Sequence, residues 1–275
     1  MKTAKLTLLL SLVTMITFAS ISPKEKEALL DFYHATSGEN WVDKWDINQP
    51  VSTWKGVTIK DDVVVKLHLE MNNLQGTMPQ SLAHLTSLKE LRLGFNKITG
   101  NIPTSLGQLQ KLEVLELYMN QLEGELPNEL MALNKLRVLK LYSNSLTGPI
   151  PNSIGNLTNL EELLLGSNFF TGTIPSEVGE LLQLEKLSLI DNKLEGRIPH
   201  ELGNLNHLKE LVLSSNQLTG RLPYGIYGLK KLSVMMVSDN NLDKDYVSII
   251  KSEDSSILGI PQNEQEGLAT DYIDD

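Results

Sequence analysis

The sequence predicts an α/β repeat fold, a solenoid of stacked 24-residue turns in which each turn contributes one short strand. The first indication is an asparagine that recurs at this spacing without insertion or deletion. The second is the alternation of leucines before each asparagine, which is the period of a strand with one buried face. The recurring residues are Asn72, Asn96, Asn120, Asn144, Asn168, Asn192, Asn216 and Asn240. One turn could not bury its own leucines, whereas stacked turns share a continuous core.

The composition is that of a globular protein without disulfides. The chain has 275 residues, of which 41% are hydrophobic and 21% charged, and this is enough apolar material for a continuous core. Cysteine is absent, which excludes disulfides, thiolate metal sites and cysteine nucleophiles. The net charge is −10 and no basic cluster stands out, so we expect no nucleic-acid partner.

The first nineteen residues have the pattern of an export signal. Lys2 and Lys5 precede an apolar run that begins at Leu6 and ends near the small residue Ala19. A membrane anchor is the alternative, but the run is shorter than the roughly 20 apolar residues that cross a bilayer. We therefore expect residues 1–19 to be a cleaved signal peptide, the protein to be secreted, and no stable membrane insertion.

Residues 20–63 are predicted to form an N-terminal cap that begins with a helix. Ser22 and Glu25 are spaced as a capping box, with Pro23 at the first helical position. Apolar residues three or four apart follow on one face, and Gly38 is a plausible stop.

The three tryptophans of the chain, Trp41, Trp45 and Trp54, fall within fourteen residues of this cap. They could form an aromatic platform for sugars, or they could pack as a hydrophobic lid over the first turn. We favour the lid, because the open end of a solenoid has to be covered.

Residues 64–242 contain seven full turns and a partial eighth, and we number the turns from Val64 and the places within each turn from one to twenty-four. The pattern LxxLxLxxNxLxGxIPxxLGxLxx is complete in turn 2, residues 88–111. The asparagine amide both donates and accepts, so a column of asparagines can satisfy backbone groups where the chain bends away from the strand. The glycine allows a backbone conformation that other residues resist, and the proline suits an irregular segment on the far side.

This pattern resembles the plant-type subclass of leucine-rich repeats, whose hallmark LxGxIPxxLGxL appears here as LTGPIPNSIGNL over residues 146–157. The resemblance covers about residues 64–242. It implies a curved, right-handed leucine-rich repeat solenoid with a parallel β-sheet on its concave side. It also implies recognition of proteins, peptides or glycans, and not catalysis.

The segment EKEALLDFYHATSGENW…STWKGV resembles the N-terminal cap of the same family, and most of all that of secreted bacterial members. In plant caps two cysteines flank the Trp-X-Gly-Val element, whereas Ser52 and Ile59 stand at those places here. The cap would then be held by packing alone. The resemblance favours an exported bacterial protein over a plant receptor ectodomain.

Residues 243–275 form a C-terminal cap and an acidic tail, with nine acidic and two basic residues. Tyr246, Val247, Ile249 and Ile250 are expected to pack a short helix onto the last turn. The remainder could be an acidic partner-binding segment, but a solvated end is the simpler interpretation.

No catalytic or metal-binding constellation stands out. The five histidines are scattered over different turns and places, and neither a zinc-protease motif nor a nucleophile elbow is present. We therefore predict no enzyme activity, no cofactor and no metal.

Function is sought at places that the scaffold does not dictate. Large side chains at the seventh and eighth places concentrate in the first four turns, beside charged residues at the fifth place. Because neighbouring strands lie about 4.8 Å apart, these side chains should form one connected patch on the concave sheet. The predicted ligand-binding residues are Met71, Arg92, Phe95, Glu116, Tyr118, Met119, Lys140 and Tyr142.

An apolar centre with charges at its margin is typical of a recognition surface, although such side chains could also pack only against each other across strands. We therefore expect a secreted recognition module whose partner is a protein, a peptide or a polysaccharide. The alternative is a structural or adhesive surface protein without a discrete site. An ice-binding variety is disfavoured because the exposed twelfth places mix Thr, Glu and Gln. Asn156 begins the one sequon of the chain and is the predicted glycosylation site.

Overall fold

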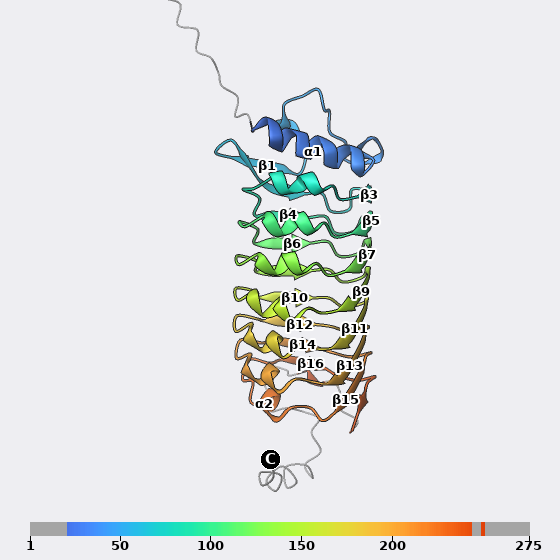
Figure 1. Cartoon of the computed structure of the whole chain (residues 1–275), viewed down its shortest axis with the longest axis vertical. Coiled ribbons are helices and arrows are strands. Elements are labelled where there is room, and N and C mark those ends of the chain that lie inside the picture. Colours follow the sequence, from blue (N-terminus) through green and yellow to red (C-terminus); the bar gives the residue numbers. More distant parts are fainter. Residues whose placement is uncertain (1–20, 244–248, 251–275) are drawn as a thin grey trace, which may run out of the picture.

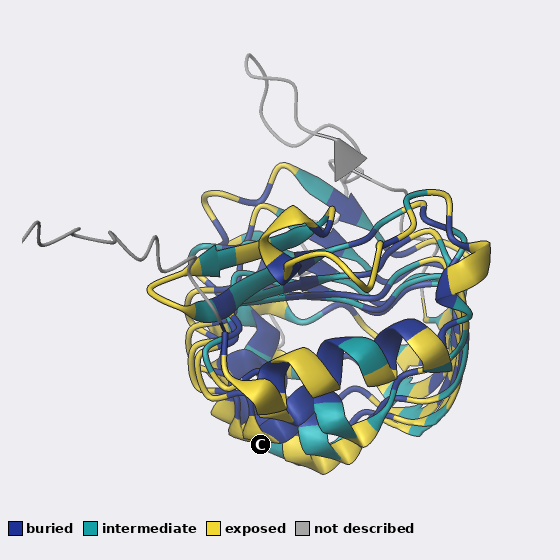
Figure 2. Ribbon diagram, turned by 90° about the horizontal axis from the view of Figure 1, so that it is seen from above, coloured by how far each residue is buried: buried dark blue, intermediate teal, exposed yellow. Residues whose placement is uncertain are grey.

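The computed structural model describes residues 21–243 and 249–250, which form a stack of turns with a helix across one end (Figure 1). The predicted signal peptide and most of the acidic tail lie outside these residues. Each of the seven full turns contributes one strand to each of two sheets and a short helical segment to the opposite side. Seen from above, the helical segments line one side of the stack, and buried residues lie toward its interior (Figure 2).

The larger sheet has ten strands in the described part of the chain. All of its pairings are parallel except the two at its ends, where β1 pairs antiparallel with β2 and β18 pairs antiparallel with β16. The repeated strands stack in register, so that Leu91, Leu115 and Leu139 are direct partners. In order across the sheet the strands are β1 (Val57–Lys60), β2 (Val63–His68), β4 (Glu90–Arg92), β6 (Val114–Glu116), β8 (Val138–Lys140), β10 (Glu162–Leu164), β12 (Lys186–Ser188), β14 (Glu210–Val212), β16 (Val234–Met236) and β18 (Ile249–Ile250).

A second parallel sheet, of eight strands in the described residues, was not predicted from the sequence. It is built from the tenth to fourteenth places, and a glycine at the thirteenth place, such as Gly100 in β5, adopts a positive φ of 74°. Its strands are β3 (Gln75–Thr77), β5 (Lys97–Asn101), β7 (Gln121–Glu125), β9 (Ser145–Pro149), β11 (Phe169–Thr173), β13 (Lys193–Arg197), β15 (Gln217–Gly220) and β17 (Asn241–Leu242).

The far side of each turn is a short helix preceded by the repeat's proline. The 3₁₀ helices of the repeats are η3 (Gln80–His84), η4 (Thr104–Gln108), η5 (Asn128–Ala132), η6 (Asn152–Asn156), η7 (Ser176–Glu180) and η8 (His200–Asn204), followed by α2 (Tyr224–Tyr227). In each of these segments a proline is the N-terminal flanking residue, as Pro103 is for η4. The leucines of strand and helix together fill one continuous core.

The asparagine column satisfies backbone groups, as predicted. Oδ1 of Asn144 accepts a hydrogen bond from the N–H of Leu122 at 3.1 Å. Its Nδ2 donates to the carbonyls of Leu117 at 3.1 Å and Leu141 at 2.9 Å. The same contacts recur from turn to turn, so each asparagine ties its own turn to the preceding one.

The N-terminal cap begins with α1 (Pro23–Ala35), and both halves of the predicted capping box are present. Glu25 is 5% exposed, and its second carboxylate oxygen accepts a hydrogen bond from the N–H of Val64 at 3.0 Å. This bond fastens the cap helix to the first repeat. Two 3₁₀ turns, η1 (Gly38–Asn40) and η2 (Val51–Thr53), complete the cap.

The tryptophans of the cap are buried and stacked. Trp41, Trp45 and Trp54 are at most 3% exposed, and each indole N–H donates to a backbone carbonyl at 2.9–3.0 Å. The rings of Trp45 and Trp54 stack at 4.7 Å between centroids. Their faces are therefore not available to a sugar, and the lid interpretation fits the structure.

The C-terminal expectation of a helix is corrected for the residues that are described. Ile249 and Ile250 form the strand β18 against β16. A two-residue apolar stretch carries no period that separates strand from helix, and the free edge of β16 offers backbone hydrogen bonds that a helix could not use.

Candidate functional site

Three aromatic rings form one cluster just beyond the ends of β4, β6 and β8. Tyr118 and Tyr142 stack with ring centroids 4.7 Å apart and an interplanar angle of 11°. Phe95 meets Tyr118 edge to face at 5.6 Å and 85°. We call Phe95, Tyr118 and Tyr142 the aromatic cluster. One ring comes from each of three consecutive turns, because the strands stack in register.

Burial raises the pKa of Tyr118, and the charges of Glu116 and Glu70 raise it further. Burial likewise raises the pKa of Tyr142. Both hydroxyls therefore remain protonated over the physiological range and can donate as well as accept a hydrogen bond.

A row of exposed apolar side chains adjoins this cluster and shares Phe95 with it. Met71, Phe95 and Met119 occupy the eighth place of turns 1, 2 and 3 and are 71%, 48% and 40% exposed. We call these three residues the apolar row. Their φ angles lie between 52° and 56°, in the left-handed region that large side chains avoid.

The same backbone conformation recurs at the eighth place of every later turn, where the chain carries small polar residues. These are Ser143, Ser167, Asp191, Ser215 and Asp239. Serine and aspartate suit this conformation better than a large apolar side chain does. Large exposed apolar groups in an unfavourable conformation on three successive turns indicate a function other than folding.

Charged side chains cross the same sheet in a continuous chain of contacts, which we call the ion-pair ladder. Its members alternate in sign from turn 1 to turn 6, at N–O distances from 2.7 to 3.3 Å. In order they are Lys66, Glu90, Arg92, Glu116, Lys140, Glu162 and Lys186, and His68 also contacts Glu90 at 3.0 Å.

The ladder lowers the pKa values of two of its carboxylates, those of Glu90 and Glu162. Burial opposes ionisation of Glu90, but hydrogen bonds and charges from Lys66 and Arg92 outweigh it and lower its pKa. Burial also opposes ionisation of Glu162, and Lys140 with Lys186 lowers its pKa in the same way. Glu90 and Glu162 are therefore charged at neutral pH and hold the cations that they contact.

Glu116 lies on the sheet as predicted, but it is not free. It is 5% exposed, and its two carboxylate oxygens contact Nη1 of Arg92 at 2.8 Å and Nζ of Lys140 at 3.2 Å. The expectation that its side chain would reach a ligand directly does not match this burial. Its role in the surface is to fix the two cations beside the aromatic cluster.

The structure brings the other predicted residues onto one surface. Arg92 and Lys140 are partly exposed in the ladder, and the N–H of Met71 donates to the carbonyl of Gly94 at 3.1 Å, which places the two turns side by side. Sequence reasoning missed the third-place members of the ladder, of which Glu90 is the most connected. Their signal was present, because charges of opposite sign alternate at the third and fifth places.

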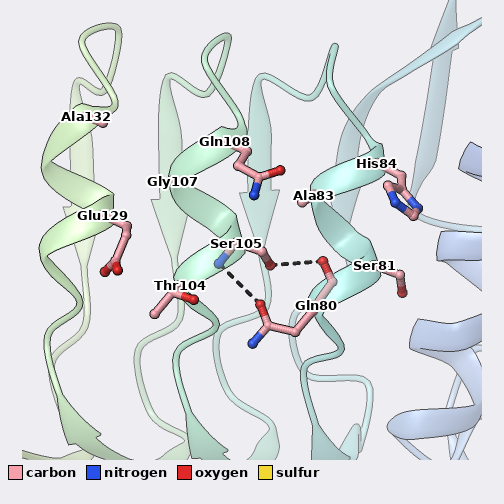
Figure 3. A pocket seen from close by; sticks show the side chains of 10 residues that line it. All are labelled: Gln80, Ser81, Ala83, His84, Thr104, Ser105, Gly107, Gln108, Glu129 and Ala132. Carbon is pink, nitrogen blue, oxygen red and sulfur yellow. Dashed lines mark hydrogen bonds between the residues drawn. The ribbon is translucent and has the colours of Figure 1, made fainter.

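The helix side carries a separate, open groove of about 710 Å³ between η3, η4 and η5 (Figure 3). Its walls include Gln80, Gln108 and Glu129, and Oγ of Ser105 donates to the carbonyl of Gln80 at 2.9 Å. None of the predicted ligand-binding residues lines it.

Within residues 21–243 and 249–250, no three histidine or acidic side chains come together as metal ligands would. The helices in this part of the chain are also too short or too polar to cross a membrane.

The parallel sheet, the asparagine column and the proline-led helices define a leucine-rich repeat solenoid. A family model described as a leucine-rich repeat region matches residues 63–191, and one described as a leucine rich repeat matches residues 183–205 and 207–229. The chain is a leucine-rich repeat protein. Comparison with curated proteins gave no match.

Among solved structures, the chain is similar to PEPR1 in its complex with AtPEP1, at 31% identity and a TM-score of 0.72 over 79% of this chain and 32% of that one. It is also similar to the ectodomain of the plant membrane receptor kinase GASSHO1/SCHENGEN3 from Arabidopsis thaliana, in complex with CASPARIAN STRIP INTEGRITY FACTOR 2. The identity is 30% and the TM-score 0.65, over 79% of this chain and 30% of that one. A third is the Arabidopsis receptor kinase HAESA ectodomain in complex with an extended IDA peptide hormone, at 30% identity, a TM-score of 0.62 and coverage of 80% and 42%. This chain thus spans less than half the length of each of these three chains.

A plant ice-binding protein is similar at 24% identity and a TM-score of 0.54, with 81% of this chain and 88% of that one covered. This likeness concerns the fold alone.

Proposed function

We propose that this protein binds a polypeptide ligand, either a peptide or a surface segment of a protein, on the concave sheet of turns 1 to 4. The observation that carries the proposal is the apolar row beside the aromatic cluster. Exposed Met and aromatic side chains beside fixed cations are the groups that anchor protein interfaces.

The packing of the cluster favours a polypeptide over a polysaccharide. A sugar stacks on an open aromatic face, whereas Tyr118 uses one face against Tyr142 and receives the edge contact with Phe95. The cluster offers ring edges and phenolic hydroxyls, which suit the side chains and backbone amides of a polypeptide. The HAESA structure, which shares this fold, is by its description a complex with a peptide hormone ligand. The PEPR1 and GASSHO1/SCHENGEN3 structures, which also share the fold, are complexes with AtPEP1 and with CASPARIAN STRIP INTEGRITY FACTOR 2.

The ion-pair ladder supports recognition by a rigid surface. Arg92 and Lys140 are each held by two carboxylates, so little side-chain freedom remains to be lost when a ligand binds. Contacts made by preorganised groups contribute more to affinity than the same contacts made by mobile ones.

The proposal places the protein outside the cell, exported by the predicted signal at residues 1–19, with a cysteine-free cap like that of secreted bacterial relatives. Asn156 is exposed at the end of η6, on the helix side of the stack. A glycan attached there would leave the concave sheet open.

The proposal is tested with the double variant Tyr118→Ala/Tyr142→Ala. Secreted polypeptides and cell-wall polysaccharides are screened against the purified wild-type protein, and each hit is measured against the variant. We expect a polypeptide hit that the variant no longer binds, with circular dichroism and unfolding close to those of the wild type.

Leu182→Ala is the matched control, because Leu182 is 55% exposed and lies outside the aromatic cluster and the apolar row. Full binding by the double variant would refute the site. Polysaccharide hits without polypeptide hits would refute the ligand class, and self-association without any hit would support the structural alternative.

A further inference from the structure

Gly94 lies directly beneath the ring of Tyr118. It occupies the seventh place of turn 2, which is the first place after β4 that the repeat pattern leaves variable. A Cβ atom added to it would lie 2.6 Å from Cζ, 2.7 Å from Cε1 and 2.9 Å from Cε2 of Tyr118. Carbon atoms do not approach so closely without overlap, so the tyrosine ring uses the space that the glycine leaves empty.

The requirement for glycine at this position is steric and not conformational. The thirteenth-place glycines have positive φ angles, such as 74° at Gly100, but Gly94 is not among the positive-φ glycines. An alanine could therefore adopt the backbone conformation of Gly94 without strain. The effect of a methyl group there would fall on Tyr118.

Tyr118 is the central ring of the aromatic cluster. It stacks on Tyr142 on one side and meets Phe95 on the other. A methyl group at position 94 would lift the Tyr118 ring away from the sheet and disturb both contacts. The arrangement of three rings that a ligand meets thus depends on a residue that has no side chain.

We infer that Gly94 is the positioning residue of the ligand site, and that the absence of a side chain there sets the specificity of turns 2 to 4. The binding part of this inference rests on the proposed function, whereas the positioning part does not. A residue without a side chain at the seventh place of turn 2 leaves room for the ring of the next turn's tyrosine. A larger residue there would displace that ring and change the shape of the surface.

The chain contains a matched control at the seventh place of turn 5. A Cβ atom on Gly166 would lie 2.6 Å from Cγ2 of Ile190, so the crowding is similar. Gly166 also lacks a positive φ, and Ile190 is not part of the aromatic cluster. Gly166→Ala should therefore show the general effect of a methyl group at this place, and Gly94→Ala the effect on the cluster.

The positioning role is measured without any ligand. We expect Gly94→Ala to change the tyrosine signal in near-ultraviolet circular dichroism and to leave the far-ultraviolet spectrum unchanged. We also expect Gly94→Ala to lower the unfolding midpoint in urea when Tyr118 is present, but not in the Tyr118→Ala background. Such non-additivity identifies two groups that act on each other. Equal effects in the two backgrounds, or an unchanged near-ultraviolet spectrum, would overturn the inference.

The specificity role is measured with a peptide selected on the wild-type protein from a random display library and then labelled with a fluorophore. We expect Gly94→Ala to weaken its binding by about tenfold or more, and Gly166→Ala by less than about twofold, as displacement of a central interface anchor implies. Wild-type affinity in Gly94→Ala, together with a displaced ring, would overturn the specificity role. A selected peptide that binds Tyr118→Ala/Tyr142→Ala as well as wild type would refute the proposed function and leave the positioning of Tyr118 by Gly94 intact.

Discussion

Glu25 of the cap helix accepts a hydrogen bond from the backbone N–H of Val64, the first residue of the repeats, at 3.0 Å. The same carboxylate accepts a hydrogen bond from the N–H of Ser22 at 3.2 Å. One buried acidic residue therefore closes the start of the helix and attaches that helix to the solenoid.

Replacing Glu25 with alanine should destabilise the protein by about 1–3 kcal/mol, because the N–H of Val64 would be buried without an acceptor. Urea unfolding followed by circular dichroism measures this loss. Glu27→Ala is the control, because Glu27 is exposed on the same helix. Equal stability of the two variants would show that the bond to Val64 contributes nothing.

Asn144→Ala should also be destabilising, by at least about 2 kcal/mol, because the amide serves three backbone groups of two turns. Thermal and urea unfolding report the change. Asn159→Ala should have a much smaller effect, because Asn159 is exposed and makes a single bond to the carbonyl of Asn134. If the two variants unfold at the same temperature and the same urea concentration, the buried asparagine column is not what links the turns.

Stability should fall in acid partly through the ion-pair ladder. The pKa values of Glu90 and Glu162 are lower in the folded protein than in the unfolded chain. Their contribution is complete above the ordinary glutamate pKa of about 4.3 and is lost as the pH falls through the lower folded values. Glu90→Gln/Glu162→Gln should therefore be less stable than wild type at pH 7 and lose less stability on acidification.

The measurement is the free energy of unfolding in urea at several pH values between neutral and acid. Glu27→Gln is the comparison, because Glu27 lies exposed on the cap helix outside the ladder. If the free energy of unfolding depends on pH in the same way in the wild type and the double variant, the ladder does not contribute to the loss of stability in acid.

Met71→Asn should raise stability and reduce ligand binding. Met71 is 71% exposed at φ 53°, where asparagine is better accommodated, so a gain of about 0.5–1 kcal/mol is expected. Unfolding in urea and titration with a selected peptide give the two results. The reverse change, Ser167→Met at φ 50°, should lower stability without affecting binding. A loss of stability in Met71→Asn would show that the methionine packs usefully in the free protein.

The 24-residue repeat made the solenoid predictable, and the resemblance to leucine-rich repeats implied its concave parallel sheet. The capping box was predictable from the spacing of Ser22 and Glu25. The second sheet was not predicted, since in strands such as β5 only Ile98 is fully buried and a glycine follows soon after. Such short, mostly polar strands show no apolar alternation in the sequence. Their pairing in the second sheet depends on the strands of the neighbouring turns.

The placement of the candidate residues on one face of the sheet was predictable, whereas their exposure was less so. Alternation along the strand placed Glu116 on the outer face, and it lies there. Its burial is produced by partners twenty-four residues away on either side, Arg92 and Lys140. The positive φ angles at the eighth place were not predicted from the sequence either, although the Ser and Asp residues at this place in the later turns are compatible with them.

Both margins of the larger sheet end in a reversed strand, β1 at one end and β18 at the other. A further turn from a second molecule would have to continue the parallel hydrogen-bond pattern, and neither margin presents it. Proteins commonly prevent filament growth by closing such margins. Within the described residues, a further parallel turn at either margin of the larger sheet would therefore meet a strand that runs in the opposite direction.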